Sequence, residues 1–221
     1  MQRDRVARIW FATTALVGAF ALVAQLVLVF AGAAVLVEDD PPTLGQRLLR
    51  FVSYFTVQAN VAVLLSVLPL IREPHHDAPG WRVLRLSALV GIIITGVVHW
   101  FLLRPLLDLT GWSYATDKLL HVVVPALAVV GWLAFGPRPR INGRVILLAV
   151  VWPVAWLGYT LVMGAVAGWY PYPFIDVGQL GAAPVAVSCV AIAAGFFAVA
   201  GLMALVDRRS SAGRDRDRVA G

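Results

Sequence analysis

Residues 9–37 read IWFATTALVGAFALVAQLVLVFAGAAVLV and contain no Asp, Glu, Lys or Arg. A helix needs about 20 apolar residues to cross the hydrocarbon core of a bilayer, because each residue advances it by about 1.5 Å. This stretch is therefore long enough to span a membrane. Five further apolar stretches follow at 51–71, 84–103, 119–135, 145–167 and 182–206. We predict an all-α, polytopic membrane protein built as a bundle of six transmembrane helices.

The composition agrees with this fold class. Of the 221 residues, 60% are hydrophobic and 14% are charged, whereas soluble domains carry about 25% charged residues. This excludes an ordinary soluble enzyme, a disordered chain and a nucleic-acid-binding domain. The single Cys189 excludes an intramolecular disulfide and a thiolate metal cluster. Every basic residue except Lys118 is Arg, which suggests a GC-rich, bacterial genome.

The basic residues predict how the bundle is oriented. Fourteen of the 18 lie in the N-terminal segment, in the loops after the second and fourth spans, and after residue 206. The other four are Arg47, Arg50, Arg104 and Lys118, in the loops after the first and third spans. The positive-inside rule then places both termini in the cytoplasm. We expect a multi-pass protein of a bacterial plasma membrane, with a membrane domain at 1–206 and a disordered, charged tail at 207–221.

The first span has one alternative interpretation. Basic residues precede it and Ala31-Gly32-Ala33 resembles a cleavage site, so the segment could be a signal peptide. Its apolar run is much longer than the 7–15 residues of a signal-peptide core. We therefore predict an uncleaved first helix.

A few polar residues fall inside the spans, where they are costly and are candidates for function. Thr56 and Asn60 lie on one face of the second span together with Ser53, and Asp117 precedes His121 by one helical turn. The predicted topology places Thr56, His99 and His121 within about 8 Å of the same outer membrane edge. The aromatic loop 168–176, GWYPYPFID, lies on that side as well.

Each of these residues also has a structural interpretation. A membrane threonine commonly bonds a carbonyl of its own helix. His99 near a helix end can simply bond a neighbouring helix, and the aromatic loop can be an interfacial belt.

Three segments together carry a resemblance to a known family. Residues 54–60 (YFTVQAN), 120–125 (LHVVVP) and 168–176 resemble, in order and spacing, the androgen-induced-protein family, which includes the androgen-dependent TFPI-regulating protein. The resemblance implies a six-helix intramembrane hydrolase of fatty acid esters of hydroxy fatty acids. The family threonine nucleophile falls on Thr56 and the family histidine on His121. The family's aromatic loop corresponds to 170–174 and its acidic residue to Asp176, while the stretch between Thr56 and His121 is shorter than in vertebrate members.

The residues themselves are compatible with that chemistry. A threonine hydroxyl becomes a useful nucleophile when a base within about 2.6–3.2 Å takes its proton. We expect His121 to be this base, oriented by Asp117 or Asp176, with Asn60 as an oxyanion donor. His99 is a further supporting residue. The residues expected to bind substrate are Trp169, Tyr170, Tyr172 and Phe174.

The expected partners are membrane lipids and a lipid-ester substrate, with no nucleic acid, metal or cofactor. The sequence contains neither a Gly-x-Ser-x-Gly elbow nor a His-Glu-x-x-His motif. Two other functions remain open from the sequence. One is a haem- or quinone-binding protein that uses His99 and His121, and the other is a non-enzymatic scaffold, channel or transporter. The sequence does not predict the oligomeric state.

Overall fold

The computed structural model describes residues 1–33, 41–138 and 140–219, with side chains described through Arg209. These residues form helices joined by short loops, and we find no strand among them. Six helical segments are long and apolar enough to cross a membrane. They are Gln2–Phe30, Phe55–Arg72, Pro79–Leu106, Gly111–Phe135, Gly143–Ala167 and Ala182–Arg209. The prediction of an all-α molecule with six such helices is confirmed.

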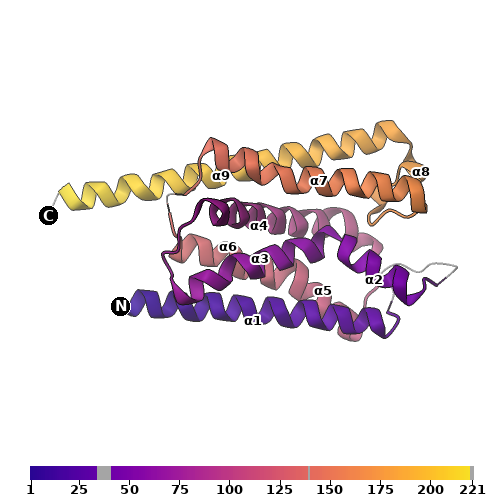
Figure 1. Cartoon of the computed structure of the whole chain (residues 1–221), viewed down its shortest axis with the longest axis horizontal. Coiled ribbons are helices and arrows are strands. Elements are labelled where there is room, and N and C mark those ends of the chain that lie inside the picture. Colours follow the sequence, from indigo (N-terminus) through magenta and orange to yellow (C-terminus); the bar gives the residue numbers. More distant parts are fainter. Residues whose placement is uncertain (34–40, 139, 220–221) are drawn as a thin grey trace.

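Helix α4 (Pro79–Val98) lies at the centre of the bundle (Figure 1). On one side it packs against α3 (Phe55–Arg72), which in turn packs against α1 (Gln2–Phe30). On the other side it contacts α7 (Gly143–Ala167) and α9 (Ala182–Val219). The N-terminus and the C-terminal end of α9 lie at the same end of the molecule, as an even number of spans requires.

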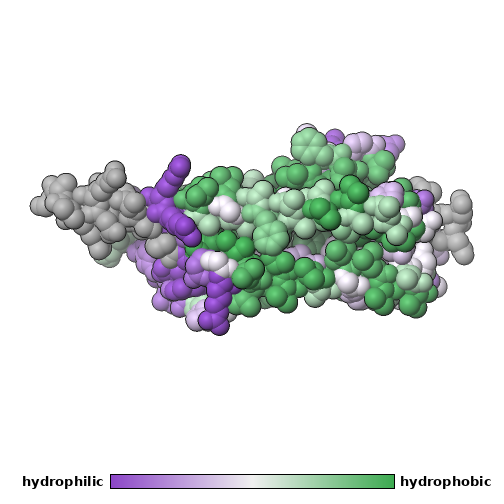
Figure 2. All heavy atoms as spheres, turned by 90° about the horizontal axis from the view of Figure 1, so that it is seen from above, coloured by the Kyte–Doolittle hydropathy of each residue, from purple (hydrophilic) through white to green (hydrophobic). Residues whose placement is uncertain are grey.

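The sequence of α4 explains its central position. Its middle turns, Leu86 to Ile92, are buried without interruption, as expected of a helix that is apolar on all sides. Gly91 also lets the ring of Trp152 from α7 approach closely, since a Cβ at position 91 would lie 2.8 Å from that ring. The outer helices instead expose large apolar side chains, and hydrophobic residues cover most of the visible flank between more hydrophilic ends (Figure 2).

The second predicted span is interrupted, contrary to the sequence prediction of one helix over 51–71. Helix α2 (Leu44–Ser53) ends before Tyr54, whose extended backbone (ψ 126°) separates it from α3. Thr43 begins α2 with a capping box, because its hydroxyl accepts from the Gln46 amide and the Gln46 side chain accepts from the Thr43 amide. The break places Thr56 in the first turn of α3 and leaves Ser53 on α2.

The third and fourth spans each contain a π-helical segment, at His99–Leu103 and Leu119–Val123. Helix α5 (Gly111–Lys118) leads into the second of these, and α6 (Val124–Phe135) follows it. Pro125 has no amide hydrogen to bond the carbonyl four residues earlier, so a regular α-helix is disfavoured there. Single π turns of this kind occur often at functional sites. They place both His99 and His121 on irregular backbone.

At the end of the bundle that lies away from His99 and His121, two residues are more buried than the sequence predicts. Arg85, counted with the basic loop residues although it lies at the edge of the predicted span 84–103, is buried in α4, where it donates to Ser66 Oγ (3.2 Å) and lies over the Phe11 ring. Asp207, predicted to begin a solvated tail, is 1% exposed and accepts from the Arg140 and Ile141 amides. From there α9 continues as helix to Val219, because extending an existing helix avoids the cost of nucleation.

Candidate active site

Thr56 and His121 face each other where α3 meets the π segment of the fourth span. Thr56 Oγ1 lies 3.3 Å from His121 Nε2. His121 Nδ1 lies 3.0 Å from a carboxylate oxygen of Asp117 and 3.0 Å from its backbone carbonyl oxygen. Because Nδ1 faces two acceptors, it carries the ring proton. The lone pair of Nε2 therefore faces the threonine hydroxyl, at 3.3 Å, just above the range of about 2.6–3.2 Å over which a base takes a proton.

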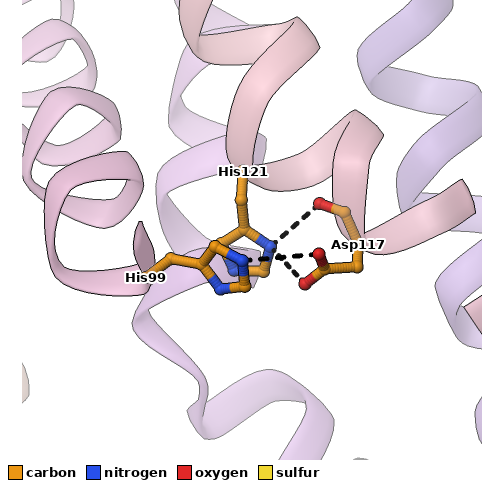
Figure 3. Close-up of side chains that lie close together, drawn as sticks. All are labelled: His99, Asp117 and His121. Carbon is orange, nitrogen blue, oxygen red and sulfur yellow. Dashed lines mark hydrogen bonds and ion pairs between the residues drawn. The ribbon is translucent and has the colours of Figure 1, made fainter. Parts of the chain in front are cut away.

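The Asp117 carboxylate is shared by three basic side chains. His99 Nε2 and Lys118 Nζ approach its second oxygen at 3.4 and 3.2 Å. The His99 and His121 rings stack in parallel, with centroids 3.8 Å apart (Figure 3). His99 and Asp117 are both buried and His121 is nearly so. His99 of the third span and Asp117 of the fourth span thus hold the His121 ring in one orientation.

Tyr172 is the partner of Thr56 that sequence reasoning missed, since it was expected only to bind substrate. Its hydroxyl oxygen accepts from the Thr56 amide at 3.3 Å and lies 3.4 Å from Thr56 Oγ1. The amide is free for this contact because the first N–H groups of a helix have no acceptor within the helix. Burial raises the pKa of Tyr172 above its ordinary value, so the hydroxyl stays protonated and remains a donor.

Two predicted supporting residues have other roles. Asn60 Nδ2 donates to the Thr56 and Leu120 carbonyls at 2.9 and 3.2 Å. Both of its amide hydrogens are thereby used, so the expectation that it donates to an oxyanion is wrong. Asp176 caps the short helix α8 (Val177–Leu180) by accepting from the Gln179 amide. Asp117, not Asp176, is the carboxylate that contacts His121.

The aromatic loop packs down onto α2 and α3. Trp169 meets Tyr54 edge-on, with centroids 5.8 Å apart, and the Arg50 guanidinium lies over its ring. Phe174 stacks on Tyr172. A small pocket of about 70 Å³ is lined by Trp169. Ser53 and Tyr159 line it as well, and their side chains are hydrogen-bonded to each other (2.8 Å). The loop therefore anchors Tyr172 as well as covering the site.

Tyr170 fixes the start of this loop by packing against Gly164 of α7. A Cβ at Gly164 would lie 2.0 Å from the Tyr170 ring. We expect Gly164→Ala to destabilise the protein by about 1–3 kcal/mol through overpacking. Gly158→Ala on the same helix is the matched control, because a Cβ there meets nothing within 4 Å. Thermal unfolding in detergent measures both, and equal melting temperatures for the two variants would show that this contact does not hold the loop.

An apolar cavity of about 130 Å³ begins at Thr56 and Tyr172. It extends between α7 and α9, with α4 behind it. Its lining includes Trp156 and Leu157 from α7 and Ile192 and Phe196 from α9. The candidate nucleophile thus lies at the polar end of a space that suits a hydrocarbon chain.

The same cluster contains residue types that bind metals and haem. His99, Asp117 and His121 bring possible ligand atoms within 4.8 Å of one another. Parallel stacking directs the in-plane lone pairs of the two imidazoles side by side instead of toward a common point. A haem iron needs its two axial nitrogens facing each other across the metal, so these two histidines do not fit a bis-histidine haem. Each imidazole instead places a ring nitrogen within 3.4 Å of the Asp117 carboxylate.

Comparisons with protein-family models, with curated proteins and with solved structures found no match to this chain. The resemblance to the androgen-induced-protein family therefore stays a prediction.

The role of Tyr172 leads to a prediction at this site. Tyr172→Phe keeps the ring that stacks on Phe174 and removes only the hydroxyl beside Thr56. We expect turnover of the esters that the family resemblance implies to fall about 100-fold, as on loss of one oxyanion donor. Steady-state kinetics measure it, and Tyr159→Phe, which removes a hydroxyl bonded to Ser53 in the neighbouring pocket, is the matched control. Unchanged turnover in Tyr172→Phe would remove this residue from the mechanism.

Proposed function

We propose that this protein is an integral membrane hydrolase of lipid esters, with Thr56 as nucleophile and His121 as general base. One observation carries the proposal. The Thr56 hydroxyl lies 3.3 Å from Nε2 of a histidine whose Nδ1 contacts the Asp117 carboxylate, at the polar end of an apolar cavity. A buried hydroxyl that only stabilised the bundle would not need this base.

The proposed reaction has two steps. His121 Nε2 takes the Thr56 proton as Oγ1 attacks the ester carbonyl carbon, and the resulting imidazolium is stabilised by Asp117. His121 then gives that proton to the departing alcohol, which leaves an acyl ester on Thr56. In the second step His121 takes a proton from water, the hydroxide attacks the acyl carbon, and Thr56 recovers the proton as the fatty acid leaves.

Charge that develops on the carbonyl oxygen has donors nearby. The Tyr172 hydroxyl lies 3.3 Å from the Thr56 amide nitrogen at the start of α3 and 3.4 Å from Oγ1. The partial positive charge of a helix N-terminus favours an oxyanion at this place. In this structure the Tyr172 oxygen accepts from the Thr56 amide. We propose that the carbonyl oxygen of the bound substrate takes over this hydrogen bond and also accepts one from the Tyr172 hydroxyl.

The positive-inside rule predicts on which side of the membrane this site lies. Thr56 and the aromatic loop lie at the end of the bundle opposite the two termini. With the basic termini in the cytoplasm, the site lies under the outer headgroups of a bacterial plasma membrane. Water then reaches the acyl intermediate from outside, and the ester comes from the lipid phase. Its identity, including the hydroxy-fatty-acid esters that the family resemblance suggests, is part of the proposal.

The test is hydrolysis by the purified protein in mixed detergent–lipid micelles. We expect p-nitrophenyl octanoate to be cleaved with release of equal amounts of alcohol and fatty acid, above the rate in protein-free micelles. His121→Ala, purified in parallel, supplies the control for contaminating esterases. Equal rates for the parent protein and His121→Ala would contradict the proposed function.

A further inference from the structure

We propose that the cavity between α7 and α9 binds the acyl chain of the ester and selects chains shorter than one membrane leaflet. This inference rests on the proposed function, because it names the substrate class of the same site. It predicts a medium-chain esterase, whereas ordinary membrane phospholipids carry chains that fill a leaflet.

The position of Thr56 decides which part of the ester occupies the cavity. The polar groups Thr56 and Tyr172 lie at one end, and the lining beyond them is almost wholly apolar. The acyl group remains bonded to Thr56 between the two steps, whereas the alcohol must leave and be replaced by water. The chain that stays bonded to Thr56 needs an apolar space beside it, so we assign this cavity to the acyl chain.

The depth of the cavity follows from the helices that line it. On α9 the lining extends from Cys189 to Phe197, an advance of about 12 Å at helical rise. On α7 it extends from Val150 to Leu157, about 10 Å. One leaflet of hydrocarbon is about 15 Å thick, half of the bilayer core. A leaflet-length chain attached at Thr56 is therefore too long for this space.

On α9 the lining residues furthest from the loop that carries Tyr172 are Phe196 and Phe197, and we assign the floor of the cavity to Phe196. Its ring is 6% exposed and belongs to the main apolar core, and the adjacent Gly195 brings α9 close to Ile94 of α4. At the sides, Val154 and Phe197 line the cavity and are also about half exposed on the lipid-facing surface. The cavity thus has a lateral opening through which a chain enters from the bilayer, and a floor that limits its length.

The experiment compares the rates at which alkyl fluorophosphonates label the full-length protein in detergent. We expect the octyl probe to react at least about tenfold faster than the butyl probe, because each buried methylene adds to binding. The hexadecyl probe should react more slowly than the octyl probe, because its chain extends beyond the floor.

Three variants make the test specific to this cavity. Phe196→Ala removes the floor and should raise the hexadecyl rate relative to the octyl rate several-fold. Ile192→Trp fills the cavity and should lower the octyl rate about tenfold or more while sparing the butyl rate. Val190→Trp is the matched control on α9, because Val190 is 69% exposed and does not line the cavity. Equal rates for all three probes, or equal effects of Ile192→Trp and Val190→Trp, would overturn the inference.

A second measurement separates this inference from the proposed function. Thr56→Ala protein is irradiated with a photoreactive octanoic acid, and the crosslinked peptides are mapped by mass spectrometry. Crosslinks to 150–157 and 189–197 support the cavity assignment even if no probe ever labels Thr56, an outcome that would refute only the nucleophile. If Thr56 were labelled at rates that do not depend on chain length and the crosslinks lay elsewhere, the cavity assignment would be refuted. The proposed hydrolase function would not be affected by that result.

Discussion

Replacing Thr56 with alanine is expected to lower ester turnover by about 10³-fold or more, because the covalent route through its hydroxyl is lost. Thr56 Oγ1 contacts His121 and Tyr172 side chains and no carbonyl of its own helix. The hydroxyl is therefore not required to complete the helix. The measurement is the initial rate of p-nitrophenyl octanoate hydrolysis at equal protein concentration.

Thr56→Ser is the matched variant for this prediction. Serine keeps the oxygen and removes one methyl group, so we expect it to retain turnover within about tenfold of the parent. Thr56→Val keeps the shape and lacks the oxygen, and should be as inactive as alanine. Melting temperatures in detergent show whether each variant is folded. An active Thr56→Val protein would exclude threonine as the nucleophile.

The second large effect is expected for Asp117→Asn, which should lower turnover about 10²–10³-fold. The change removes the charge that stabilises the imidazolium, and it offers an amide donor that favours the wrong His121 tautomer. The Asp117 backbone carbonyl at 3.0 Å from Nδ1 remains, so the loss is smaller than if both acceptors vanished. Most of the loss should appear in kcat, with KM changed little, because Asp117 does not line the cavity.

Asp176→Asn is the control for this substitution. Asp176 was the other carboxylate that the sequence offered as a partner for His121, and the structure gives it the cap of α8. Asparagine caps a helix as well as aspartate does, so turnover should be unchanged. If Asp176→Asn were as damaging as Asp117→Asn, the assignment of Asp117 as the orienting residue would fail.

The architecture was largely predictable from the sequence. Apolar stretches of membrane length with at most one charged residue have few folded alternatives to a spanning helix, so six spans were found from hydropathy alone. The ends of the individual spans were less predictable. Arg85 stands at the edge of a predicted span, and its burial beside Ser66 and Phe11 is visible only in the structure. The sequence around Asp207 predicts a solvated tail, and its hydrogen bonds with the Arg140 and Ile141 amides are visible only in the structure.

The site was predictable where its contacts are local. Asp117 and His121 are one turn apart, so helical spacing alone predicts that they meet. Thr56 and His121 lie 65 residues apart, and their contact depends on the break at Tyr54 and on the π turn before Pro125. Neither irregularity has a clear signal in hydropathy. The error over Asn60 has the same origin, because its acceptors include the Leu120 carbonyl from another helix.

The central claim is that His121 activates Thr56, and the most direct measurement is the mapped site of the octyl fluorophosphonate adduct. We expect the parent protein to gain one adduct, located on Thr56 by peptide mass spectrometry, and the labelling rate to fall at least about 100-fold in His121→Ala. An adduct on any other residue, or labelling of Thr56 at the parent rate without His121, would contradict this account.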